Sequence, residues 1–322
     1  MKRNVVIVLC VLLTAIILSA CGSKENMGKE DDSGKIKVGF SQQSTEVAYR
    51  IMQTESIKQA AEKSGYQLVF TDAQNDTAKQ TSDVEDLVSQ KIDYLALSPR
   101  DFEGAATALA AAKKAGIPVI LIDRLAAGVP GEDYVAFIGS DYIWEGEQAA
   151  EWIAKKTDGK AKIVELTGTV GASAAKDRSV GFHQVVDKHP DMEVIVSQTA
   201  DFSRAEAQKV MENIIQARGN EIDAVYAHND EMAIGASLAL KAAGYKPGKD
   251  ILIVGIDGDK AAFDLIKAGE YSATIFSSPY FGPLLFEVID NLVAGKEVEQ
   301  TIILPGDVID ADNIDEKMDL AY

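Results

Sequence analysis

Apolar positions in this chain follow two patterns that alternate from residue 36 onward. Short, continuously apolar runs, such as 118–122 (PVILI) and 251–256 (ILIVGI), have the length and composition of buried strands. The stretches between them, such as 77–90, space their apolar residues as amphipathic helices do. Strands that are buried on both faces and separated by helices are typical of parallel sheets. We therefore predict an α/β fold with two doubly wound parallel-sheet lobes joined by a hinge.

The expected elements alternate along the chain. Strands are predicted at 36–40, 67–70, 94–97, 118–122, 135–138, 162–166, 193–197, 224–227, 251–256, 272–276 and 301–304. Helices are predicted up to residue 63 and at 77–90, 103–115, 145–156, 174–188, 204–217, 231–243 and 281–294. The expected lobes are 35–139 plus 278–305 for the first and 140–277 plus 306–322 for the second.

The amino terminus has the pattern of an export signal. Lys2 and Arg3 precede an apolar run from 5 to 20, which is short for a membrane span. Leu18-Ser19-Ala20-Cys21 resembles the lipobox of bacterial lipoproteins, and this resemblance implies that residues 1–20 are a signal peptide and that Cys21 carries a lipid anchor. Residues 21–34 would then be a polar linker between lipid and domain. An uncleaved signal anchor is the alternative.

Composition narrows the function classes. The 322 residues are 47% hydrophobic, which is enough for two domains with apolar cores, and the net charge of -18 argues against a nucleic-acid partner. The only cysteines are Cys10 and Cys21, so the folded part has no disulfide and no thiolate metal site. We predict neither a metal nor a cofactor, and we expect ordinary surface or helix positions for the three histidines: His183, His189 and His228.

Polar and aromatic residues follow the predicted strands at the ends where a ligand would bind. In the unit 224–258, Asn229 comes just after one strand and Asp257 just after the next. The carboxyl ends of parallel strands share one edge of a sheet, and open α/β sheets bind ligands there. Placement just beyond other strands adds further candidates: Glu46, Tyr49, Arg50, Asp123, Arg124, Arg178 and Phe202.

These side chains suit an uncharged ligand rich in hydroxyl groups. Carboxylates accept hydrogen bonds from hydroxyls, guanidinium groups donate as a planar fork, and an aromatic face covers the C–H side of a sugar ring. The positive charges of three arginines would also be largely compensated by the negative charges of two or three nearby carboxylates.

Structural roles stay open for the same residues. Asp123 and Arg124 could form a structural ion pair, Arg178 could be a solvated helix residue, and Tyr49 and Phe202 could be core aromatics. Their shared placement after strands favours a ligand site.

The helix after strand 224–227 also needs a cap at its start. Either Asn229 or Asp230 can supply the side-chain oxygen. We interpret Asp230 as the cap and Asn229 as a ligand contact.

Several of these motifs together resemble the bacterial periplasmic sugar-binding proteins of ABC importers, of the ribose-binding type, across 36–304. The resemblance is carried by LIDR (121–124), GTVGASAAKDRSVGF (168–182), ADFSR (200–204), AHNDEMAIGA (227–236) and GIDG (255–258). It implies the periplasmic binding protein type I fold. It also implies that the sugar contacts lie at the matching positions: Asp123, Arg124, Arg178, Phe202, Asn229 and Asp257.

Within that family, the segment FSQQSTEVAYR (40–50) looks like one in the galactofuranose-binding member, which implies that Glu46, Tyr49 and Arg50 contact the sugar. Tyr49 stands where that member has tryptophan, and Ser277 stands where ribose binders have glutamine. The resemblance therefore favours a furanose or pentose such as galactofuranose over ribose itself.

The predicted function is that of a non-enzymatic substrate-binding lipoprotein of an ABC sugar importer. It would capture a monosaccharide between two lobes by hinge closure and deliver it to a membrane permease, from a lipid-anchored position on the outer face of the cell membrane or in the periplasm. Three alternatives remain: a sugar sensor that presents its closed form to a signalling partner, a sugar-acting or nucleotide-dependent enzyme, and a transcription regulator of the lactose-repressor type. The enzyme alternative lacks a phosphate-binding glycine motif, and the regulator alternative lacks a helix-turn-helix before residue 36.

Overall fold

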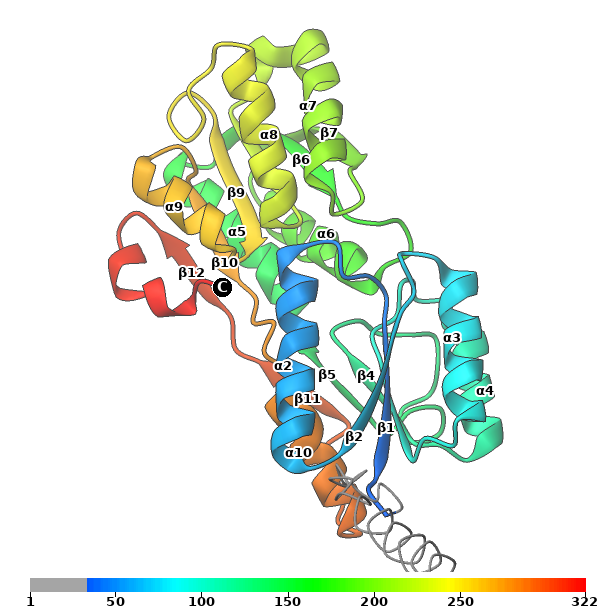
Figure 1. Cartoon of the computed structure of the whole chain (residues 1–322). Coiled ribbons are helices and arrows are strands. Elements are labelled where there is room, and N and C mark those ends of the chain that lie inside the picture. Colours follow the sequence, from blue (N-terminus) through cyan, green and yellow to red (C-terminus); the bar gives the residue numbers. More distant parts are fainter. Residues whose placement is uncertain (1–33) are drawn as a thin grey trace, which may run out of the picture. The chain divides into compact units, whose positions relative to one another are not determined.

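The computed structural model describes residues 34–322, and residues 36–322 form one unit. The predicted signal peptide and the predicted anchor at Cys21 lie outside the described residues. Within the described residues, the strands form two sheets of α/β type, each covered by helices on both faces (Figure 1). The predicted fold class is confirmed.

The first sheet is parallel throughout, in the order β11-β5-β4-β3-β1-β2. Its strands are β1 (Lys37–Gln42), β2 (Gln67–Asp72), β3 (Tyr94–Leu97), β4 (Val119–Ile122), β5 (Ala136–Ser140) and β11 (Thr301–Leu304). Helices α2 (Ala48–Ser64) and α10 (Gly282–Val293) cover one face, and α3 (Thr77–Ser89) and α4 (Ala106–Ala115) cover the other (Figure 1). Successive residues of β4 point into these two cores in turn, which explains its continuous apolar run.

The second sheet has the order β12-β10-β9-β8-β6-β7. Its strands are β6 (Lys160–Thr167), β7 (Asp191–Thr199), β8 (Ala224–Ala227), β9 (Leu252–Asp257), β10 (Ala273–Phe276) and β12 (Asp307–Asp310). Helices α5 (Tyr142–Lys156) and α6 (Ser173–Val186) lie on one face, and α7 (Arg204–Arg218), α8 (Asp230–Ala242) and α9 (Lys260–Ala268) on the other. Short 3₁₀ turns complete the chain at Gly219–Glu221, Ile314–Glu316 and Met318–Leu320.

The chain passes between the two sheets at three places in the described part: after β5, after β10 and after β11. Two of these passages lie side by side, because Ser140 Oγ and Ser277 Oγ are 2.9 Å apart. Strand β5 ends at Ser140, one residue beyond the predicted limit of the first lobe at 139, and the limits of both lobes stay a prediction.

Some elements differ from the expected ones. Helix α5 begins at Tyr142 rather than at 145, because the Asp141 carboxylate accepts a hydrogen bond from the Trp144 N–H (3.0 Å) and caps it. Helix α9 and strand β12 were not predicted, and β12 pairs antiparallel with β10 at the edge of an otherwise parallel sheet.

Residues 34–322 contain no candidate membrane span and no candidate metal cluster. No helix in this part combines the length and apolar character that a bilayer crossing requires. The same part holds no group of three or more histidine, cysteine, aspartate or glutamate side chains arranged to bind a metal ion.

A candidate ligand-binding cavity at the strand ends

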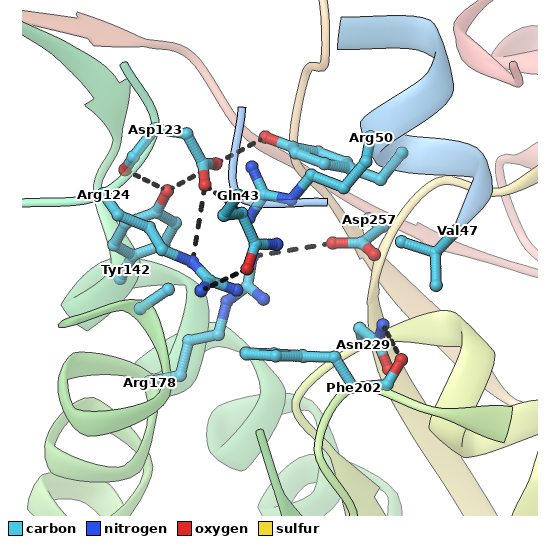
Figure 2. Close-up of a pocket in the computed structure, with 12 residues that line it drawn as sticks. Gln43, Val47, Arg50, Asp123, Arg124, Tyr142, Arg178, Phe202, Asn229 and Asp257 are labelled. Carbon is cyan, nitrogen blue, oxygen red and sulfur yellow. Dashed lines mark hydrogen bonds and ion pairs between the residues drawn. The ribbon is translucent and has the colours of Figure 1, made fainter. Parts of the chain in front are cut away.

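A polar cavity lies at the carboxyl ends of strands from both sheets. It encloses about 370 Å³ of space, part of it open to solvent. Both sheets contribute to its wall (Figure 2): Gln43, Val47, Tyr49, Arg50, Asp123, Arg124, Tyr142, Ala174, Arg178, Phe202, Asn229 and Asp257.

The structure brings together the predicted site residues except one. Tyr49 and Arg50 lie in the first turn of α2, Arg124 follows β4, and Asp257 is the last residue of β9. Glu46 instead is exposed and lines an adjacent hollow next to the cavity. Its contact with a ligand stays a prediction.

Asp123 is the shared acceptor of this cavity. Its carboxylate lies 2.7 Å from Arg50 Nη2 and accepts hydrogen bonds from the hydroxyls of Tyr49 (3.0 Å) and Tyr142 (2.8 Å). Arg124 Nε is more distant, at 3.8 Å. Burial alone would raise the pKa of Asp123, but Arg50 and Arg124 outweigh it and lower the pKa below its ordinary value. Asp123 is therefore a carboxylate that can accept hydrogen bonds.

Arg124 is held in place yet has a free donor. Its Nη1 donates to Gln43 Oε1 (3.1 Å) and to the Arg100 carbonyl (2.9 Å), and its guanidinium lies 5.2 Å from the centre of the Phe202 ring (Figure 2). Its Nε, in contrast, is buried without a hydrogen-bond partner among the described residues. Buried donors in native proteins nearly always have partners. A ligand hydroxyl in the cavity would satisfy this one.

Arg178 is buried rather than solvated. Its Nε donates to Glu145 Oε2 (2.8 Å), its Nη1 donates to the His228 carbonyl (2.6 Å), and its Nη2 lies 3.6 Å from Asp257 Oδ1. Burial raises the pKa of both Glu145 and Asp257, while Arg178 acts in the opposite direction.

Asn229, and not Asp230, caps helix α8, so our interpretation of Asp230 was wrong. Asn229 has the extended backbone of a cap residue, and its Oδ1 accepts from the Met232 N–H (2.9 Å). Asp230 is already helical and points into the protein. Its carboxylate accepts from the backbone of Gly258 and Asp259 and from two hydroxyls, those of Tyr271 and Thr274, at 2.6–2.9 Å. Asp230 thus holds the loop that follows Asp257.

Three cavity residues have backbone conformations that are rare outside glycine. The φ angles are 67° at Asp123, 57° at Phe202 and 132° at Asp257. Such conformations cost about 1–3 kcal/mol each and concentrate at ligand sites, where the surroundings hold them. Their presence in one cavity supports a binding role for it.

Sequence reasoning missed several residues of the site. Tyr142 lies two residues past the end of β5. It was missed because the strand was predicted to end at 138, which placed Tyr142 too far from the strand end. Gln43 follows β1 in the same way. Val47 and Ala174 are small apolar residues without a sequence signal, and Glu145 touches the site only through Arg178.

His228 is also not an ordinary surface or helix histidine. It is buried next to Asn229, and its Nε2 lies 3.1 Å from Glu165 Oε1. Glu165 also accepts from Ser179 (2.8 Å) and Ser197 (2.6 Å). Burial alone would raise the pKa of Glu165, but His228 and the serine hydroxyls lower it to about 2. Burial lowers the pKa of His228, which favours a neutral imidazole.

Replacing Glu165 with glutamine should reduce the loss in the free energy of unfolding that occurs at acid pH. The pKa of Glu165 falls from 4.5 when unperturbed to about 2 in the folded protein, so its contribution is present above about pH 4.5 and is lost as the pH falls towards 2. Between pH 6 and pH 3 the wild type should lose about 2 kcal/mol more than the variant. Urea unfolding at both pH values measures this difference. Equal losses in the two proteins would contradict the ionised state of Glu165.

Two α/β sheets that share a mostly buried polar cavity at their strand ends define a two-lobe ligand-binding protein. The chain belongs to the periplasmic binding protein family, because the sequence profile of the periplasmic binding protein domain matches residues 38–297. It is accordingly a binding protein and not an enzyme. The resemblance drawn from the sequence motifs is confirmed.

Curated relatives and solved structures agree with this family. The chain is 40% identical to the ribose import binding protein of Bacillus subtilis strain 168, over 95% of this chain and 98% of that protein. It is 38% identical to the galactofuranose-binding protein of Escherichia coli K12, over 80% and 81%. The binding protein of the arabinose ABC transporter from Shewanella sp. ANA-3, solved with α- and β-L-arabinofuranose, is similar with a TM-score of 0.85 and 38% identity, covering 88% of this chain and 94% of that one.

Proposed function

We propose that this chain is the sugar-capturing component of an ABC importer, which encloses one uncharged monosaccharide in the cavity and passes it to a membrane permease. The observation that carries the proposal is the buried ring of arginines and carboxylates supplied by both sheets, in which Arg124 Nε has no partner among the described residues. The named ligands of the relatives, which are ribose, galactofuranose and arabinofuranose, support a sugar of this size.

The chemistry of the wall fits a small polyol. The free edges of Arg124 and Arg178 donate to ring and hydroxyl oxygens, and the carboxylates of Asp123 and Asp257 accept from hydroxyls. The Phe202 ring borders the cavity and offers an apolar face for the C–H side of a sugar. We favour a furanose or pentose such as galactofuranose, because two of the three relatives described above are named or titled with a furanose as their ligand.

Hinge bending at the three passages between the sheets would open and close the cavity. The proposed lobes are 35–139 plus 278–305 and 140–277 plus 306–322, and the paired hydroxyls of Ser140 and Ser277 lie where two passages meet. Lipid anchoring at Cys21 on the outer face of the cell membrane remains part of the proposal on the basis of the lipobox-like sequence.

Titration calorimetry with a panel of furanose-forming and pyranose sugars tests the proposal. We expect at least one sugar to bind, and Arg124→Ala and Asp257→Ala each to weaken binding about tenfold or more, because a hydrogen bond to a charged group contributes about 1.5–3 kcal/mol. Thermal melts should show both variants folded, and Glu270→Ala, which removes a surface ion pair with Lys241, serves as the control. If no sugar binds, the proposed function is wrong. If affinity is unchanged in either variant, that residue is not a ligand contact.

A further inference from the structure

Positively charged side chains outnumber negatively charged ones in the wall of the cavity. Three arginines line it, Arg50, Arg124 and Arg178, but only two carboxylates do, Asp123 and Asp257. Burial raises the pKa of Asp257, and the neighbouring Arg178 Nη2, at 3.6 Å, favours its charged form. All of these side chains are buried, with Asp257 the most exposed at 7%. Charges in such surroundings act strongly on a ligand, because little water screens them. A cavity with one surplus cation would favour a sugar that carries an anionic group.

Glu145 on α5 supplies the missing negative charge from outside the wall. Its side chain is 1% exposed, and its Oε2 lies 2.8 Å from Arg178 Nε. Arg178 therefore uses its Nε edge for Glu145 and its Nη1 for the His228 carbonyl, which leaves Nη2 beside Asp257 and the cavity. Burial raises the pKa of Glu145, while Arg178 and the Ser277 hydroxyl lower it, and Arg178 is the charged partner of this carboxylate among residues 34–322.

We propose that Glu145 is a specificity-determining residue that makes the site select uncharged sugars over sugar acids and sugar phosphates. This inference rests on the proposed function and extends it. Glu145 cancels the charge of Arg178 from behind, so the arginine still donates hydrogen bonds to a neutral ligand while the cavity as a whole attracts no anion. The carboxylate is a positioning group in the same sense, because it fixes the plane of the Arg178 guanidinium.

Glu145→Gln is the direct substitution, because it keeps the size of the side chain and removes its charge. Gln Oε1 can still accept from Arg178 Nε, so the arginine should keep its orientation. The cavity gains one net positive charge only a few ångströms from the ligand, which should favour an anionic ligand by about tenfold or more relative to its neutral counterpart. The nearby buried carboxylate of Glu165 keeps its own donors in both proteins and does not alter the comparison.

The experiment compares matched pairs of neutral and anionic sugars by titration calorimetry at pH 7.5: D-galactose with D-galacturonate, D-ribose with D-ribose 5-phosphate, and D-fructose with D-fructose 6-phosphate. The wild type should prefer the neutral member of a bound pair by about 100-fold or more. In Glu145→Gln the preference should shrink by about tenfold or more. Glu270→Gln removes the same charge from an ion pair on the surface, with Lys241, and should leave the preference unchanged.

The outcomes separate this inference from the proposed function. If the wild type binds a neutral sugar and its anionic partner equally well, or if folded Glu145→Gln keeps the wild-type preference, the role of Glu145 is overturned while sugar binding stands. If no neutral sugar binds the wild type, both fall together. Should Glu145→Gln not fold, the preference of the wild type decides, together with Glu145→Asp, which keeps the charge and should keep the preference.

Discussion

Replacing Asp123 with alanine should weaken sugar binding by about 100-fold or more and lower the free energy of unfolding by about 3–5 kcal/mol. The carboxylate is the common partner of Arg50 at 2.7 Å and of the hydroxyls of Tyr49 and Tyr142. Without it, buried Arg50 and Arg124 lose their negative partner. Among the described residues, Asp123 is the carboxylate that forms an ion pair with each of these two arginines. Removal of one partner from a buried ion pair is among the most costly single substitutions.

The measurement combines urea unfolding with titration of the sugar identified in the panel. Asp123→Asn is the matched control, since its amide oxygen can still accept from Tyr49 and Tyr142 while the charge is lost. It should therefore be more stable than Asp123→Ala but still bind sugar weakly. An alanine variant within about 1 kcal/mol of the wild type would show that Asp123 does not hold the arginines.

Replacing Asp230 with alanine should destabilise the fold by about 3–5 kcal/mol, although Asp230 does not line the cavity. Its carboxylate accepts from the backbone N–H groups of Gly258 and Asp259 and from the hydroxyls of Tyr271 and Thr274. Alanine would leave these buried donors without a partner. The loop after β9 would lose its anchor, so Asp257 would be displaced and sugar affinity should fall as well.

Asp230→Asn distinguishes this hydrogen-bonding role from a role of the negative charge. The amide oxygen can accept from the two backbone N–H groups, and the amide N–H₂ can donate to the hydroxyl oxygens of Tyr271 and Thr274, which can serve as acceptors. Unfolding experiments should therefore show less than about half of the loss seen with alanine. Equal losses in both variants would indicate that the charge of Asp230, rather than its hydrogen bonds, stabilises the loop.

Most of the fold was predictable because the central strands have continuous apolar runs. Strand β4 is apolar at every position and β9 is apolar up to Asp257, so neither shows the alternation of a half-exposed element. The missed elements are the short ones. Strand β12 is a four-residue edge strand with aspartate at both ends, and helix α9 spans only nine residues directly after the turn at Gly258.

The sequence by itself determined which side chains stand at the strand ends. Asp123, Arg124, Asn229 and Asp257 were found in this way because parallel strands end on one edge of a sheet, so a local pattern places each residue on that edge. The alternation of strands and helices likewise determined the fold class, because hydrophobic periodicity is local.

Only the tertiary structure decided which of these groups meet, and how their charges balance. Asp123 receives Arg50 from α2 and Tyr142 from α5, and Glu145 neutralises Arg178 from behind the cavity wall. Glu46, although it lies in the same segment as Arg50, lines the neighbouring hollow. These pairings depend on how helices far apart in the sequence pack against the two sheets. Residue spacing along the chain does not predict that packing.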